Sequence, residues 1–93
     1  MRYRIRFTAE AQREGNRLPG HVRQRILRLV EGQAADPYPT EAVELRDCPG
    51  FHRIRVDRRR LVYFVDEDAG IVWIIRTGLK HGPEFYQDLP SPG

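Results

Sequence analysis

The segment from Phe51 to Val65 constrains the fold more than any other part of the chain. Its first half, FHRIRV, alternates apolar and charged residues, so its arginines lie on the strand face opposite Ile54 and Val56. Its second half, LVYFV, is apolar almost throughout, as expected of a strand that is buried on both sides. Only the four residues DRRR separate the halves. The segment therefore predicts an antiparallel hairpin with a tight, very basic turn.

Positive charge is concentrated at this hairpin. Five arginines fall within the eight positions from Arg53 to Arg60. Between Arg46 and Arg60, six arginines stand against two aspartates, whereas the rest of the chain has 10 basic and 11 acidic residues. An ordinary soluble surface mixes the two signs. The concentration of one sign indicates an anionic partner for this region.

Length and composition limit the chain to one modest core, so we expect a single domain over residues 1–93. No apolar run approaches the roughly 20 residues that span a bilayer, and the N-terminus lacks the apolar core of a signal peptide. Cys48 is the only cysteine, which excludes an internal disulfide and favours the cytoplasm. The histidines and the cysteine show no metal-ligand spacing, and no glycine-rich phosphate loop is present. We therefore expect neither a metal nor a cofactor.

The N-terminal part of the chain predicts a strand followed by two helices. Residues 2–7 alternate strictly, with Arg4 and Arg6 on the charged face. Thr8 can cap a short helix, which ends before a Leu-Pro-Gly break. From His21 to Ala35 the apolar residues recur at helical spacing. Two helices separated by so short a break should form a hairpin on the sheet.

The C-terminal part predicts three consecutive strands and a last helix. A proline-rich connector, in which residues 41–45 favour a turn of helix, leads to the basic hairpin. The acidic turn DEDAG joins the hairpin to an apolar strand over residues 71–77, and Pro83 can open a short helix. The predicted fold is α+β: an antiparallel four-stranded sheet with an N-terminal α-helical hairpin packed on one face and a short C-terminal helix. Tyr63 and Trp73 are expected in the core. The other face would carry four arginines, which suits phosphate binding: Arg4, Arg6, Arg53 and Arg55.

Four segments of the chain resemble the small RelE/ParE toxins of bacterial toxin–antitoxin pairs: YRIRFTAEAQRE, LPGHVRQRILRLVEGQAADP, FHRIRVDRRRLVYFVDED and VWIIRTGLKHGPEFY. The resemblance covers Tyr3 to about Tyr86 and implies the α+β fold given above. Its RelE branch implies an endoribonuclease that cuts messenger RNA, usually on the ribosome. Its ParE branch implies poisoning of DNA gyrase instead. Both branches imply a cognate antitoxin that wraps and silences the toxin in a heterocomplex.

The resemblance also implies which residues act. The two basic residues on the first strand of the hairpin correspond to Arg53 and Arg55, and the one that starts the next strand corresponds to Arg60. The basic residue two positions after a glycine is Lys80, and the C-terminal tyrosine is Tyr86. The implied reaction is attack of the ribose 2′-OH on the adjacent phosphate, which requires a base, cationic groups and an acid.

Proton transfer in this chain cannot be assigned to the three arginines, because arginine stays protonated in proteins. Two of them stand where some relatives have lysine, and all three are predicted to stabilise the charge on the phosphate. His81 has the unperturbed pKa closest to neutrality. The base is expected to be His81 or Tyr86, and the acid Lys80 or His81.

Structural alternatives remain for most of these residues. Arg58 and Arg59 can be solvated turn residues, His81 can be part of a plain loop, and Tyr86 can pack the last helix on the core. Two alternative functions also remain open. One is a ParE-like gyrase inhibitor, since such proteins also carry a basic surface, and the other is a catalytically degenerate protein that only binds an antitoxin.

Overall fold

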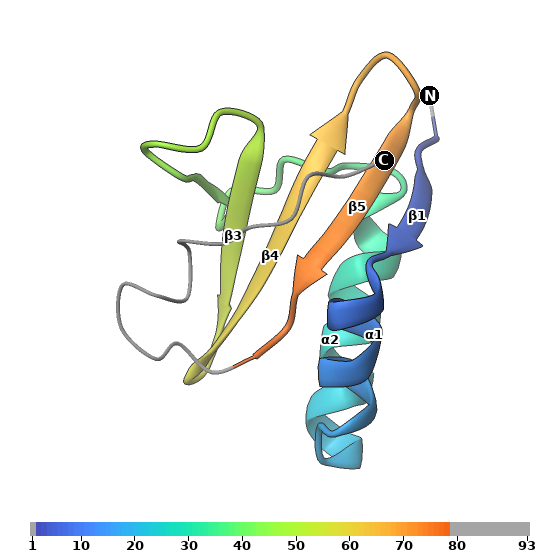
Figure 1. The fold of residues 1–93 in the computed structure, drawn as a ribbon, viewed down its shortest axis with the longest axis vertical. Helices are drawn as coiled ribbons and strands as arrows, with labels where there is room; N and C mark the ends of the chain where they lie inside the picture. The colour runs from blue at the N-terminus through green and yellow to red at the C-terminus, as the bar shows by residue number, and fades with distance from the viewer. Residues whose placement is uncertain (1, 79–93) are drawn as a thin grey trace.

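Two helices lie on one face of a five-stranded sheet in the computed structural model, which describes residues 2–78 (Figure 1). In chain order the elements are β1 (Arg4–Phe7), α1 (Ala9–Asn16), α2 (Gly20–Gln33), β2 (Val43–Glu44), β3 (Phe51–Val56), β4 (Arg59–Asp66) and β5 (Ile71–Arg76). The predicted α+β class and the two N-terminal helices are confirmed. The predicted C-terminal helix lies outside the described residues.

The strands of the sheet lie in the order β1-β5-β4-β3-β2. β3, β4 and β5 form the expected antiparallel meander, but β1 pairs with β5 in parallel, with Arg4 opposite Ile71. The prediction of a four-stranded antiparallel sheet is therefore wrong, because the sheet is mixed and contains a fifth strand. No tight turn links β1 to its neighbour in the sheet, so no hairpin geometry imposes an antiparallel direction on it.

The fifth strand, β2, comes from the connector in which the sequence favours a turn of helix. Val43 pairs with Arg53 at the outer edge of β3. Next to this pair, the N–H of Leu45 donates to the carbonyl of Phe51 (2.8 Å). The backbone groups on the outer edge of β3 need hydrogen-bond partners, and the connector supplies them instead of coiling.

The main core lies between the helices and the sheet. The sheet contributes Ile54, Val56, Leu61, Tyr63, Val65, Val72 and Ile74, and the helices contribute Ala11, Val22, Ile26 and Val30. Thr8 caps α1 as predicted, because its hydroxyl accepts a hydrogen bond from the N–H of Ala11 (3.1 Å). Within residues 2–78, neither helix has the length and apolar character that crossing a bilayer requires.

A second apolar cluster occupies the opposite face of β4 and β5. Val62 and Ile75 are fully buried there, and Phe51, Phe64 and Trp73 pack against them. The prediction that these two strands are apolar on both faces is thus confirmed.

The turn of the basic hairpin consists of Asp57 and Arg58, between the paired residues Val56 and Arg59. Asp57 has a φ of 58°, so the loop needs a residue in the left-handed region. A two-residue loop fixes the register of the strands, and a slip by one residue would move every side chain to the other face. The hairpin turn therefore decides which arginines share a face.

Candidate functional site

Three arginines gather on the sheet face opposite the helices. Arg53 and Arg55 lie on β3, and Arg60 lies on β4 directly opposite Arg55 in the register. Directly paired residues have β-carbons about 5 Å apart. Alternation fixes their face, because Ile54, between Arg53 and Arg55, and Leu61, next to Arg60, point into the main core. We call Arg53, Arg55 and Arg60 the arginine cluster.

The arginine cluster has no anionic partner in the described part of the chain. None of its guanidinium groups lies within ion-pair distance of a carboxylate among residues 2–78. The Nε atoms of Arg60 and of the neighbouring Arg59 are buried and make no hydrogen bond within residues 2–78. Like charges directly opposite in a sheet are destabilising, and buried donors without partners are costly. Stability alone does not explain this arrangement, but a bound anion would compensate both costs.

Two arginines outside the cluster form ion pairs among residues 2–78. Arg25 of α2 contacts Asp57 at 2.8 Å, and the Nε of Arg76 contacts Glu14 at 3.0 Å. The Glu14 carboxylate also accepts a hydrogen bond from the N–H of Thr77 (2.8 Å). Glu14 thus holds the end of β5 against α1. Sequence reasoning missed Glu14, because its partners lie more than 60 residues away and no local pattern marks it.

The end of β5 lies beside the arginine cluster. The N–H of Arg60 donates to the carbonyl of Gly78 at 2.9 Å. Gly78 is the last described residue, and Lys80 and His81 follow two and three residues later in the sequence. Lys80, His81 and Tyr86 lie outside the described residues, so their expected roles remain predictions.

Arg4 and Arg6 occupy the same face as the arginine cluster but a different place on it. Both are exposed on β1, with Ile5 between them packed against the main core. β5 and β4 separate β1 from β3. At about 4.8 Å per strand, roughly 14 Å separates β1 from β3, and roughly 10 Å separates it from β4, which carries Arg60. The structure therefore brings Arg53, Arg55 and Arg60 together and places Arg4 and Arg6 at the other end of the face.

His52 faces the helix side of the sheet, away from the arginine cluster. Its ring stacks on Tyr63 (centroids 5.5 Å apart) and meets the edge of Tyr38 (5.3 Å). The Tyr63 hydroxyl donates to the carbonyl of Pro37 (2.6 Å), and burial raises the pKa of Tyr63 above its usual value, as do the nearby carboxylates of Asp36 and Glu41. His52 is thus held as a packing residue.

The cluster suits phosphate chemistry more than metal chemistry. Guanidinium groups stay charged and offer a fixed fork of donors to phosphate oxygens. Among residues 2–78, no three His, Cys, Asp or Glu side chains are grouped so that they could hold a metal ion. The described part of the site can bind anions and stabilise negative charge, but it contains no group suited to proton transfer near Arg60.

The fold of this chain is similar to several solved structures of toxins and toxin–antitoxin complexes. A double mutant of the Escherichia coli toxin RelE in the free state has a TM-score of 0.83 and 25% identity, covering 96% of this chain and 95% of that chain. The same mutant in complex with a peptide of the antitoxin RelB has a TM-score of 0.78 and 28% identity, covering 92% of each chain. The toxin–antitoxin complex RelBE2 of Mycobacterium tuberculosis has a TM-score of 0.74 and 26% identity, covering 86% of this chain and 100% of that chain. No protein-family model matches the chain, and no curated protein matches its sequence.

Proposed function

We propose that this chain, which belongs to the RelE/ParE superfamily and is the toxin of a toxin–antitoxin pair, is an endoribonuclease that cuts messenger RNA. One observation carries the proposal above the others. Arg53, Arg55 and Arg60 converge beside the end of β5 without any carboxylate partner among residues 2–78. A surface of this kind is suited to the phosphates of a polyanion.

The proposed reaction is transfer of the phosphate from the 5′-oxygen of one nucleotide to the 2′-oxygen of its neighbour. The bond between O2′ and phosphorus forms while the bond between phosphorus and O5′ breaks. A base takes the proton of the 2′-OH, and an acid gives a proton to the leaving O5′. The dianionic phosphorane between these steps is stabilised by fixed positive charge. The products are a 2′,3′-cyclic phosphate and a 5′-hydroxyl.

In this scheme Arg60 stabilises the phosphorane, because its backbone is pinned between β3 and the end of β5. Arg53 and Arg55 bind the phosphates on either side of the cut. His81 or Tyr86 serves as the base and Lys80 or His81 as the acid, as the sequence predicts. Arg4 and Arg6 extend the phosphate-binding surface toward the other edge of the sheet.

The partners follow from the same proposal. Two of the similar structures contain an antitoxin or an antitoxin peptide, and we propose that a cognate antitoxin binds and silences this chain. The substrate is messenger RNA held on the ribosome, so the protein acts in the cytoplasm. A ribosome-bound message presents single-stranded codons, whose 2′-OH groups are free to reach in-line geometry.

Transcript mapping after brief induction in bacteria tests this function. Wild type, Arg60→Ala and the control Arg13→Ala, which removes an exposed charge on α1, are compared. We expect cuts within translated codons with 5′-hydroxyl ends for wild type and Arg13→Ala. Arg60→Ala should lower cutting about 100-fold or more, as expected for loss of one transition-state donor. Circular dichroism of each purified variant checks that the fold survives.

Three results would contradict the proposal. Growth arrest with intact transcripts would favour a gyrase inhibitor of the ParE type. The absence of both cutting and growth arrest in wild type would leave a protein that only binds its antitoxin. Undiminished cutting by a folded Arg60→Ala variant would remove Arg60 from the mechanism while leaving the ribonuclease.

A further inference from the structure

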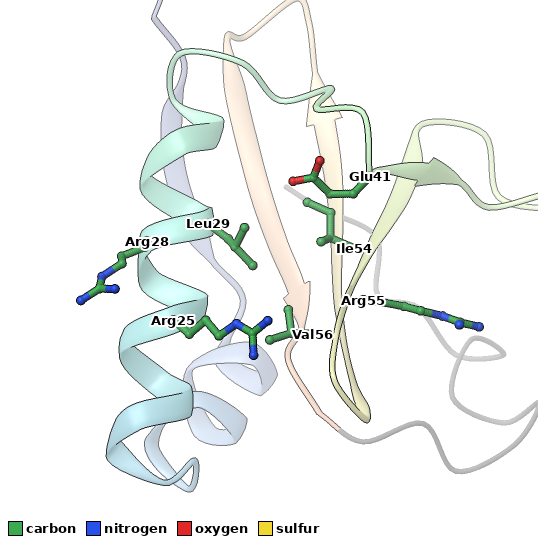
Figure 2. A pocket seen from close by; sticks show the side chains of 7 residues that line it. All are labelled: Arg25, Arg28, Leu29, Glu41, Ile54, Arg55 and Val56. Carbon is green, nitrogen blue, oxygen red and sulfur yellow. The ribbon is translucent and has the colours of Figure 1, made fainter.

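A cavity of about 180 Å³ lies between α1 and α2, next to the end of β5. We call it the α1–α2 cavity. The groove in Figure 2 is a different one, on another side of α2, where Leu29 points toward Ile54 of β3. Apolar side chains form most of the wall of the α1–α2 cavity: Phe7, Ala11, Leu18, Ile26 and Leu27.

The cavity extends to a place on α1 where the helix has no side chain. Ala11 is fully buried in the main core, and Gly15 lies four residues later on the same helix face. A Cβ added at Gly15 would meet no atom of residues 2–78 within 4 Å beyond its own stretch of helix. Glycine inside a helix is less favourable than alanine. Close packing therefore does not require a glycine here, and its effect is to leave the space open.

Thr77 adds a polar group to this apolar wall. It is 1% exposed, and its hydroxyl oxygen makes no hydrogen bond within residues 2–78. Its backbone N–H, by contrast, donates to the Glu14 carboxylate at 2.8 Å. A buried hydroxyl without a partner costs free energy, and it can both donate and accept. A ligand with a hydrogen-bonding group at this point would remove the cost.

Positive charge lies at the mouth of the cavity. The exposed Arg23 lines it, and its guanidinium donates to the carbonyls of Gly15 (3.2 Å) and Asn16 (2.8 Å) at the end of α1. These bonds fix the guanidinium beside the cavity, and arginine has more N–H donors than they use. No carboxylate among residues 2–78 pairs with it. The mouth therefore suits an anionic group.

The size and the walls of the cavity define the ligand further. An engineered cavity of about 150 Å³ in another protein holds benzene, so this one admits a single ring with small substituents. Phe7 and Leu27 are 37% and 40% exposed beside it. Aromatic rings pack favourably on one another, so Phe7 favours an aromatic occupant. A carboxylate on that ring suits Arg23, because guanidinium groups bind carboxylates with paired hydrogen bonds.

We propose that the α1–α2 cavity binds a small aromatic acid. Its ring packs on Phe7 and Leu27, its carboxylate meets Arg23, and a hydroxyl on the far side of the ring meets Thr77. The ligand would also act on the arginine cluster. The carbonyl of Gly78, next to Thr77, accepts the N–H of Arg60 at 2.9 Å, so a ligand that holds Thr77 stabilises this contact. The cavity is thus an effector site.

Nuclear magnetic resonance with the purified, 15N-labelled full-length chain tests the proposal, with 4-hydroxybenzoate as the probe. We expect saturable shifts of the amides around the cavity and a Kd of about 1 mM or tighter, as is usual for about ten non-hydrogen atoms. Benzoate, which lacks the hydroxyl, and 4-hydroxybenzamide, which lacks the charge, should each bind at least threefold more weakly. Shifts centred on the arginine cluster, or no saturable shifts, would overturn the proposal.

Hydrogen exchange tests the effect on the arginine cluster in the same sample. The Arg60 N–H should exchange with solvent at least threefold more slowly when the probe is bound. Unchanged exchange in the saturated complex would overturn the role as an effector site. RNA plays no part in either measurement, so this proposal and the proposed ribonuclease can fail separately.

Two glycine substitutions test the place of binding. Gly15→Leu fills the cavity and should weaken probe binding at least tenfold, while the Tm of the free protein rises. Gly32→Leu is the matched control, because Gly32 also lies in a helix with open space around its Cα but does not line this cavity. It should bind the probe like wild type. Equal binding by the two variants would overturn the assignment of the probe to this cavity.

Thr77→Val and Arg23→Gln test the two polar contacts. Thr77→Val should raise the Tm of the free protein by about 2 to 4 °C and abolish the preference for 4-hydroxybenzoate over benzoate. Arg23→Gln should abolish the preference for 4-hydroxybenzoate over 4-hydroxybenzamide, whereas Arg13→Gln, which removes an equal charge on α1, should keep it. A lower Tm for Thr77→Val would mean that water satisfies the hydroxyl in the free protein. That result, or a preference that survives in its variant, would overturn the contact concerned.

Discussion

Polar side chains on the two faces of the sheet differ in whether they have hydrogen-bond or ion-pair partners. On the helix-covered face, the Tyr63 hydroxyl is bonded to Pro37 and the Glu14 carboxylate holds Arg76. On the opposite face, the arginine cluster has no carboxylate partner among residues 2–78. One strand, β4, supplies residues to both faces. We propose that the bonded polar groups of the covered face stabilise the fold, whereas those of the cluster serve an external anion. The covered side is not fully satisfied, because buried side-chain atoms of Gln33, Arg59 and Thr77 also lack a hydrogen-bond partner among residues 2–78.

Two neighbouring residues of β4 give the largest expected contrast. Leu61 is fully buried on the covered face, so Leu61→Ala should lower the free energy of unfolding by about 3 to 5 kcal/mol. Arg60→Ala should change it by less than about 1 kcal/mol, because the lost guanidinium makes no ion pair among residues 2–78 and faces Arg55. Urea unfolding of both variants measures the difference. A strongly destabilised Arg60→Ala would give the arginine a structural role and would break the contrast between the faces.

The arginines of the opposite face should themselves differ in RNA binding. Arg53→Gln combined with Arg55→Gln should weaken binding of a single-stranded RNA oligonucleotide at least tenfold, and it should reduce the salt dependence of the affinity by about two phosphate contacts. Arg4→Gln combined with Arg6→Gln removes the same charge about 14 Å away and should weaken binding only about twofold to threefold. Filter binding over a range of salt concentrations measures both. Equal losses would show that net charge, and not the position of the cluster, controls binding.

The smallest expected effect concerns Tyr63 on the covered face. Burial raises the pKa of Tyr63, so the folded protein keeps a neutral phenol at a pH at which the unfolded chain, with a tyrosine pKa near 10, ionises. The stability that depends on the neutral phenol is fully present below about pH 10 and is lost as the pH rises above it. Tyr63→Phe removes the hydrogen bond to Pro37 and should cost about 1 kcal/mol at neutral pH.

The variant should also lose less stability than wild type between pH 9 and pH 11, because one titrating group is absent. Urea unfolding at several pH values measures this. Parallel pH profiles for wild type and Tyr63→Phe would show that the phenol ionises equally in both states.

Local patterns in the sequence predict most of the described fold. The alternation around Ile54 and the apolar run from Leu61 specify the hairpin and the shared face of Arg53 and Arg55. The turn is shorter than the four residues expected, since Arg59 and Arg60 belong to β4, and the place of Arg60 was expected only from the family resemblance. The direction of β1 and the existence of β2 could not be predicted, because both depend on backbone groups that distant strands leave unpaired. Tertiary contacts of this kind override local preference.

The same limit applies to the candidate sites. Glu14 and Gln33 look like ordinary polar helix residues in the sequence, and only the packing of α1 and α2 on the sheet gives them distinct surroundings. The expected proton-transfer residues Lys80, His81 and Tyr86 lie outside the described residues and rest on the sequence alone. A period of two or of 3.6 reports the face that a residue occupies, but it carries no information on which distant group that residue meets.

β5 contacts both β1 and α1, and these contacts limit how early the protein can fold during synthesis. β1 is synthesised before its sheet partner β5, and Glu14 before residues 76 and 77, which it contacts. Chains are synthesised from the N-terminus at a finite rate, so these contacts must wait for nearly the whole described chain. We expect the nascent protein to remain inactive until β5 and residues 76 and 77 have been synthesised. That delay would give a partner already present in the cell the opportunity to meet the protein as it folds.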